Sequence, residues 1–164
     1  MKWVLTTIMI SLISVTFWLW QTDGSVALIA NERLKNAANR ATHAASLQVN
    51  SYEKAQGRIV FDPVRADNAF IKTLADNLAL DYQLNPKPNT LFQKKFTILF
   101  KDYIDDNDGV TFPYYYENIS YGISKTLKGP AVIYIVTVPK PIVNNISDDY
   151  EMRKWAIYEY PMPN

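Results

Sequence analysis

The chain has 164 residues, enough for one globular domain beside a terminal segment. Its formal net charge of +1 argues against nucleic acid as a partner. The absence of cysteine excludes a disulfide framework and a thiolate metal site.

An uncharged apolar run, Trp3–Trp20, opens the chain. Its 18 residues contain no proline and no glycine. As a helix they would span about 27 Å, close to the ~30 Å hydrocarbon core of a bilayer. Trp3 at one end and Trp18 and Trp20 at the other suit the two membrane interfaces. We therefore predict a membrane anchor over residues 1–22.

Charges on either side of the run bear on its orientation. Lys2 and the amino terminus precede the run, and Asp23 is the first charge after it, which favours a cytoplasmic amino terminus and an extracytoplasmic body at the cell surface. The alternative is a cleaved signal peptide, because Ser25-Val26-Ala27 offers small residues for a cleavage site. A signal core normally spans only about 7–15 residues, so a retained anchor is favoured.

An alanine-rich stretch without proline or glycine follows, from Val26 to about Tyr52. Because alanine is the best helix former, we predict a helical stalk over residues 23–56, with Gly24 as the place for a bend. Small side chains recur at helical spacing and would let another helix or a sheet approach closely. This stripe consists of Leu34, Ala37, Ala38, Ala41, Ala44 and Ala45.

The remaining residues, 57–164, indicate an α+β domain in which the sheet is mainly antiparallel. A short strand is expected at residues 58–61. Asp62 and Pro63 are typical of a helix start, as N-cap and first helical residue, and this second helix is expected to end near Leu80. The predicted fold is therefore an amino-terminal membrane helix, a long amphipathic helix, a second short helix and a mainly antiparallel sheet domain.

Several strands are predicted after the second helix. Phe92–Ile104 and Val110–Tyr116 are expected to pair as a hairpin around Asp105–Gly109. In the first of these strands, alternating apolar residues are expected on one face. They are Phe96, Ile98, Phe100 and Ile104.

Two further strands complete the predicted sheet. Ala131–Val138 is apolar on both faces, which is typical of a central strand. Tyr150–Tyr160 is the last predicted strand, with Trp155 and Ile157 on its inner face.

No group of residues in the sequence indicates catalysis, a cofactor or a metal. Asp105–Gly109 lacks the ligand spacing of a helix-flanked calcium loop, and a solvated turn accounts for its composition. His43, the only histidine, has no partner at ligand or general-base spacing. The chain contains no GxSxG, HExxH or phosphate-binding glycine loop. We therefore expect a protein that is not an enzyme.

Three consecutive tyrosines are a candidate partner surface. Tyr114, Tyr115 and Tyr116 would alternate between the two faces of a strand, so at least one ring would point outward. Simple sheet packing is the alternative, because aromatic residues are favoured in strands.

Several stretches together resemble a known family. They are Leu34–Leu47, Gly57–Asp62, Gly129–Pro139 and Arg153–Ala156. In this layout the chain resembles the pilin-like accessory proteins of tight-adherence (TadE-type) pilus systems in Gram-positive bacteria. The resemblance implies a membrane helix, a helical stalk and an extracytoplasmic sheet domain, with pilin-like or assembly proteins as partners in an oligomer or filament. The chain differs from pilin precursors because Trp3–Trp20 contains no glutamate.

Two functions follow from this sequence. The first is a membrane-anchored, non-enzymatic structural or assembly component of a cell-surface pilus or secretion system. The alternative is an anchored extracytoplasmic module that captures a ligand or protein with its aromatic-rich sheet.

Overall fold

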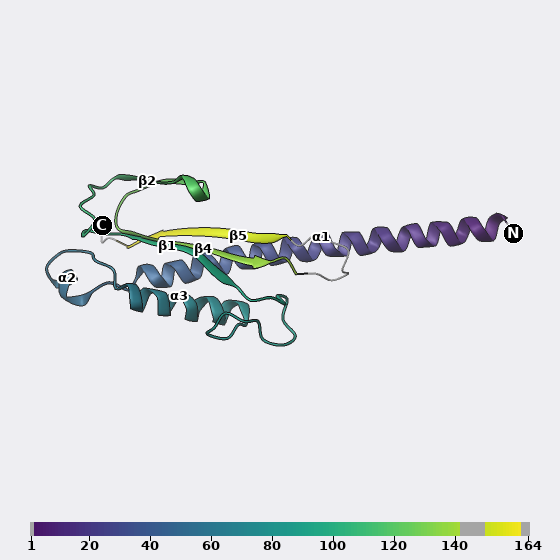
Figure 1. The fold of residues 1–164 in the computed structure, drawn as a ribbon, viewed down its shortest axis with the longest axis horizontal. Coiled ribbons are helices and arrows are strands. Elements are labelled where there is room, and N and C mark those ends of the chain that lie inside the picture. Colours follow the sequence, from purple (N-terminus) through teal and green to yellow (C-terminus); the bar gives the residue numbers. More distant parts are fainter. Residues whose placement is uncertain (1, 142–149, 162–164) are drawn as a thin grey trace.

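The computed structural model describes residues 2–141 and 150–161. Figure 1 shows a long helix whose amino-terminal half projects alone, while its other half lies within a body of helices and sheets. The predicted α+β class is confirmed. The elements are, in order, α1 (Lys2–Ser46), α2 (Ser51–Ala55), α3 (Pro63–Leu78), β1 (Thr97–Ile104), β2 (Tyr114–Asn118), the 3-10 turn η1 (Ile119–Tyr121), β3 (Ile123–Leu127), β4 (Ala131–Pro139) and β5 (Glu151–Glu159).

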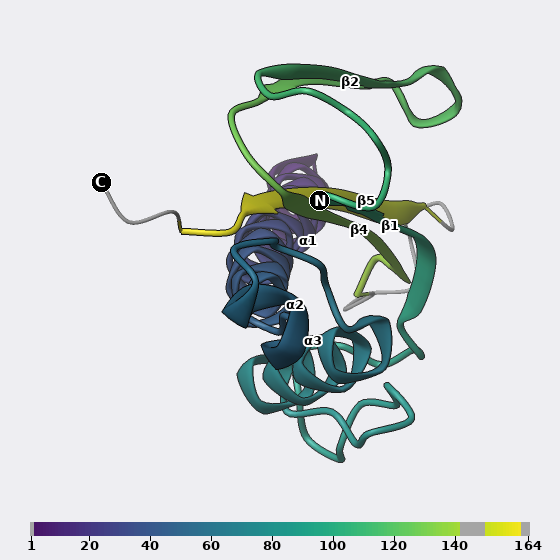
Figure 2. The ribbon, with the colours of Figure 1, turned by 90° about the vertical axis from the view of Figure 1, so that its left-hand side faces the viewer.

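The body has three layers (Figure 2). The middle layer is an antiparallel sheet with strand order β1-β4-β5. Helices α1 and α3 cover one face of this sheet, and the β2–β3 hairpin lies over the other face. Residues Ala131–Val138 of β4 are all buried, so the prediction of a central strand is confirmed.

Strand β4 contributes to two separate hydrophobic cores. Because successive side chains of a strand point to opposite faces, a strand covered on both faces has to be apolar throughout. Val132, Tyr134, Val136 and Val138 belong to the core under the helices. Ala131, Ile133 and Ile135 belong to the core under the hairpin.

Helix α3 begins where its start signals predict. The Asp62 carboxylate accepts a hydrogen bond from the backbone N–H of Arg65 at 3.0 Å, and Pro63 is the first helical residue. The helix ends at Leu78, and Ala79 adopts a left-handed conformation with φ of 54°. Local capping chemistry therefore sets both ends of this helix.

Helix α1 passes through Gly24 without a break but ends at Ser46, before the predicted residue 56. The prediction of one helix to residue 56 is wrong because Asn50 starts a separate helix. Its side chain accepts hydrogen bonds from the backbone N–H groups of Tyr52 and Glu53. Asparagine side chains compete in this way with continuous helical bonding.

Residues 58–61 form a single bridge in the described structure, between Val49 and Phe61, rather than the predicted strand. They are held instead by the acidic loop after β1. The Asp105 carboxylate accepts from the N–H of Phe61 at 2.9 Å, and the Asp106 carboxylate accepts from the N–H of Ile59 at 2.6 Å. The predicted turn is present, with residues 106–109 exposed, but its first residue, Asp105, is buried.

The predicted hairpin between Phe92–Ile104 and Val110–Tyr116 is wrong, because β1 pairs with β4 and β2 pairs with β3. A bulge in β1 also interrupts the expected alternation. Ile98 packs under the helices, whereas Phe100 packs under the hairpin. A period-two pattern assumes an unbroken strand. One extra residue in a bulge moves every later side chain to the opposite face of the sheet.

Strand β5 has one inner-face residue that the hairpin leaves uncovered. Ile157 is buried in the core under the hairpin, but Trp155 is 49% exposed. Trp155 therefore lies on the predicted face but is not buried there. Strand β5 is an edge strand with β4 as its single neighbour in the sheet, so its side chains are shielded less than those of β4.

Candidate functional site

The amino-terminal half of α1 is the candidate site with the strongest sequence signal. Every residue from 3 to 20 is exposed except Leu19, which is half-buried. Trp3, Trp18 and Trp20 are exposed and lie at the two ends of this apolar cylinder. The helix is long and apolar enough to cross a membrane. A helix that is apolar all round requires an apolar environment.

Four of the five hydroxyl groups within Trp3–Trp20, those of Thr6, Thr7, Ser14 and Thr16, donate to a carbonyl oxygen of the same helix. Thr7 Oγ1 donates to Trp3 O at 2.9 Å, and Ser14 Oγ donates to Ile10 O at 2.8 Å. In hydrocarbon, polar groups have to be satisfied inside the segment. These serine and threonine side chains are therefore compatible with a lipid environment.

The other half of α1 packs the stripe of small residues into the body. Helix α1 contacts α3, β4 and β5. Leu34, Ala37, Ala38, Ala41 and Ala45 are buried in the core, and Ala44 is half-buried. The partner of the stripe is therefore this chain's own helix and sheet. The boundary predicted at residue 56 does not separate two packing units.

The three consecutive tyrosines lie on opposite faces of β2. Tyr115 is 60% exposed, while Tyr116 is buried and Tyr114 is half-buried against the core under the hairpin. The Tyr116 hydroxyl donates to Asp102 Oδ2 at 3.0 Å. Burial, together with the Asp102 charge, raises the pKa of Tyr116 to about 12. Of the three, Tyr115 is the one whose side chain is mainly exposed to solvent.

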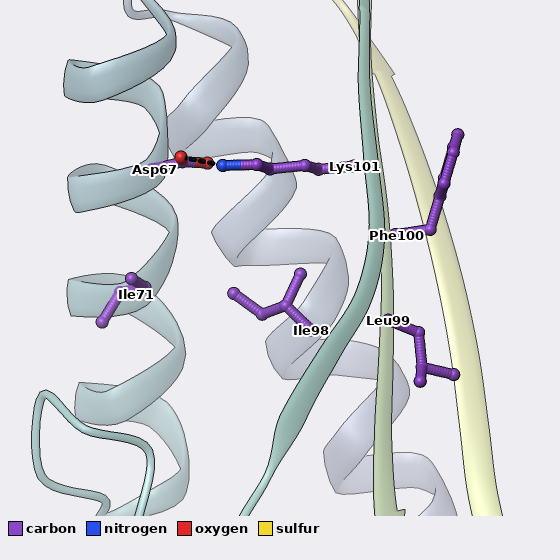
Figure 3. A pocket seen from close by; sticks show the side chains of 6 residues that line it. All are labelled: Asp67, Ile71, Ile98, Leu99, Phe100 and Lys101. Carbon is purple, nitrogen blue, oxygen red and sulfur yellow. Dashed lines mark hydrogen bonds and ion pairs between the residues drawn. The ribbon is translucent and has the colours of Figure 1, made fainter.

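A polar cluster that the sequence did not predict joins α3 to the sheet. The hydroxyl groups of Tyr103 and Tyr134 lie 2.8 Å from Asp67 Oδ1 and 2.8 Å from each other. Lys101 forms an ion pair with the same carboxylate (Figure 3). The buried Tyr134 ring stacks on Phe70, with ring centroids 3.9 Å apart. These residues are distant in the sequence, and no spacing rule connects them.

The contacts in this cluster favour an ionised Asp67 and protonated hydroxyl groups on Tyr103 and Tyr134. Burial alone would raise the pKa of Asp67, but hydrogen bonds from Lys101, Tyr103 and Tyr134 outweigh it and hold that pKa below its ordinary value of 3.8. Burial raises the pKa of both tyrosines, so their hydroxyls keep their protons. An ionised carboxylate between neutral phenols and a lysine is a structural clamp between helix and sheet.

A pocket of about 450 Å³ lies beside this clamp, between α3 and β1. Figure 3 shows Ile71 and Ile98 between the two elements, while Leu99 and Phe100 point to the other side of β1. The polar groups at the pocket, Asp67 and Lys101, are already paired with each other. The pocket therefore offers an apolar surface with no free catalytic group.

Metal-ligating side chains do not converge in the described residues, where no three His, Asp or Glu side chains come together. His43 is exposed, and its ring contacts Tyr158 with centroids 4.9 Å apart. Comparisons with protein-family models, with curated proteins and with solved structures gave no match. The resemblance to TadE-type proteins therefore stays a prediction.

Substitution of Ala41 by leucine is expected to lower the free energy of unfolding by about 1–3 kcal/mol, because extra methylene groups overpack a filled core. Ala41 is fully buried, whereas Ala44, one turn away, is half-buried. Ala44→Leu is the matched control and is expected to cost less than Ala41→Leu. Urea unfolding of the full chain in detergent micelles measures both. Equal stability of Ala41→Leu and the unchanged protein would contradict this packing.

The Asp67 clamp is expected to give the protein a specific acid sensitivity. Because the folded pKa lies below 3.8, the stabilisation is present above the unfolded pKa and is lost as the pH falls through the folded pKa. Asp67→Asn removes this titration. The difference in unfolding free energy between the two proteins should therefore shrink as the pH falls below about 4, as measured by urea titrations at several pH values. A difference that does not change with pH would exclude the clamp.

Proposed function

We propose that this protein is a membrane-anchored, non-enzymatic structural or assembly component of a cell-surface pilus or secretion system, of the minor pilin-like kind. The supporting observation is the continuity of α1. One helix, Lys2–Ser46, runs from an exposed apolar half directly into the main hydrophobic core. The proposed orientation has the amino terminus in the cytoplasm and the body outside.

Helix continuity separates this proposal from a simple tether. A binding module needs only a flexible linker between anchor and body, and glycine- and serine-rich linkers supply one. Here the segment between Trp20 and Ala30 is helical throughout. A continuous helix transmits the position and rotation of its membrane half to the body. An assembly subunit needs this coupling, because neighbouring subunits must meet in a fixed geometry.

The test is to break the coupling while keeping both parts. A Gly-Ser insertion of about seven residues after Gln21 would uncouple the helix, because Gln21 is exposed and precedes Asp23, the first buried residue of α1. The matched control is an alanine-rich heptad of equal length, which keeps the helix and its phase within about 20°. We expect the flexible insertion to abolish filament assembly and cross-linking to partner proteins, with membrane fractionation and body stability unchanged.

The opposite result favours the second candidate, an anchored binding module. Full assembly and partner capture by the flexible variant would overturn the assembly proposal. The observation that favours a binding module is the pair of exposed rings at Tyr115 and Trp155. In that case Tyr115→Ala with Trp155→Ala should abolish capture, whereas Tyr52→Ala, at another exposed tyrosine on α2, should not.

A further inference from the structure

The connection between α3 and β1 carries more lysines than acidic residues. Exposed acidic residues also lie near it, with Asp76 in the last turn of α3 and Glu151 at the start of β5. The connection between α3 and β1, residues 79–96, extends beyond α3 on the side where the apolar half of α1 leaves the body (Figure 1). It contains three exposed lysines, Lys87, Lys94 and Lys95, here called the proximal lysines. Its single acidic residue is Asp81. The segment therefore has a formal charge of +2.

This connection is tied to the core. Leu84, Phe92 and Phe96 are buried in the main core. The backbone N–H of Lys87 donates to Ala79 O at 3.0 Å, and that of Phe96 donates to Leu84 O at 3.0 Å. Buried apolar contacts and backbone hydrogen bonds oppose local opening. The proximal lysines therefore sit on an ordered surface.

Asp81 is engaged by its own loop. Its carboxylate accepts from the backbone N–H groups of Gln83 and Asn85, both at 2.8 Å, and from the Asn85 amide at 2.9 Å. These bonds, together with the Lys95 charge, lower the pKa of Asp81. None of the ion pairs among the described residues involves a proximal lysine. Lys87 and Lys94 therefore remain available to an external anion, while Lys95 also interacts with Asp81.

Helix geometry brings this end close to the bilayer surface. Asp23, three residues after Trp20, is already buried, and Ala30, ten residues after Trp20, is the first residue of α1 in the main core. These separations are about 4.5 Å and 15 Å along the helix. The headgroup layer is about 5–7 Å thick, so the near edge of the body lies at the headgroups and the main core begins about one Debye length beyond them at physiological salt. The usual tilt of membrane helices, about 20°, brings one side of the body closer still.

Two exposed tyrosines add to the same end of the body. Tyr82 is 67% exposed in the α3–β1 connection, and Tyr150 is 63% exposed just before β5. The backbone N–H of Lys140 donates to Tyr150 O at 2.8 Å, which places this pair where β4 ends and β5 begins. Tyrosine rings favour the headgroup region of membranes.

We propose that the surface formed by Tyr82 and the proximal lysines docks on the anionic lipid headgroups of the bilayer that holds α1. The proposal rests on the proposed membrane anchorage. The anchor places this surface within reach of headgroups in every molecule, and the charges are complementary. A lysine at an anionic surface strengthens binding by up to about fivefold, and this effect falls off within a Debye length. Docking of the three lysines together therefore contributes up to about 100-fold.

The experiment uses the full chain in lipid nanodiscs. Because the protein contains no cysteine, Gln83→Cys and Ser51→Cys each provide a unique dye position, one in the α3–β1 connection and one on α2 at the far end of the body (Figure 1). Energy transfer to a headgroup acceptor is measured in phosphatidylcholine discs and in discs containing phosphatidylglycerol. We expect higher transfer from position 83 in the anionic discs, reduced by high salt, and no lipid dependence at position 51.

Charge reversal supplies the matched comparison. Replacing the three proximal lysines by glutamate in the Gln83→Cys protein should abolish the lipid dependence. The same charge change at the exposed residues Lys54, Lys72 and Lys128 should leave it intact. Asp148 and Asp149, which lie outside the described residues, are left unchanged in all of these proteins, so they contribute nothing to the differences between them.

The outcomes distinguish docking from anchorage. Incorporation into discs without lipid-dependent transfer at position 83 would overturn docking alone. Equal loss of lipid dependence in both charge-reversed proteins would also overturn it, because the effect would then reflect net charge. Failure of the unchanged protein to incorporate would overturn anchorage and docking together.

Discussion

Arginine at both Ile10 and Ile13 is expected to prevent α1 from remaining in a bilayer. Both side chains are exposed near the middle of the apolar half. An arginine at the centre of a membrane helix costs about 2.5–3.5 kcal/mol, and each lost isoleucine removes about 0.3–0.6 kcal/mol of favourable insertion. The double variant therefore loses about 6–8 kcal/mol of insertion free energy. Flotation and alkaline extraction of membranes should find it in the soluble or aggregated fraction.

The matched control places two arginines on the body. Leu47 and Ile119 are exposed apolar residues outside the anchor half, and the double variant Leu47→Arg with Ile119→Arg adds the same charge. It is expected to fractionate with membranes as the unchanged protein does. If Ile10→Arg with Ile13→Arg also resists extraction, the apolar half of α1 is not the anchor.

Truncation of Phe70 is expected to cost the most stability of any single change in the body. Its ring is fully buried in the main core and stacks on Tyr134. Removing a buried aromatic side chain typically costs about 3–5 kcal/mol, through lost burial and the cavity left behind. Because stacking also holds Tyr134 in the Asp67 clamp, Phe70→Ala should loosen α3 from the sheet. Urea unfolding followed by circular dichroism, in detergent micelles, measures the loss.

A control on the same helix separates the core effect from helix propensity. Val64 is exposed near the start of α3, and Val64→Ala should change stability by no more than about 0.5 kcal/mol. A loss below about 1 kcal/mol for Phe70→Ala would mean that the core collapses around the missing ring, which is not expected for an aromatic contact between a helix and a sheet.

These effects bear on how anchor and body act together. Helix α1 is held by α3 and by the sheet, and α3 is held to the sheet by the Asp67 clamp and by Phe70. The three elements form one packed unit. Weakening the packing of α3 should therefore also weaken the packing of α1 in the body. Phe70→Ala should then impair the proposed assembly function even though the anchor is intact.

Local signals in the sequence determined several elements of this protein. The uncharged run Trp3–Trp20 is sufficient for an apolar helix, because hydropathy and length act within the segment. Asp62 and Pro63 are sufficient for the start of α3, since a cap and its target N–H lie three residues apart. The apolar run Ala131–Val138 indicates a central strand, because only burial on both faces tolerates it.

The tertiary structure alone decided which segments meet. Pairing of β1 with β4 rather than with β2 depends on a whole sheet, so an adjacent turn is a poor guide. The bulge at Ile98–Phe100 depends on register with β4. Contacts between Asp67 and Tyr134, and between Asp105 and Phe61, join residues far apart in the chain. Such contacts form only when the folded backbone brings the groups together, and no sequence spacing encodes them.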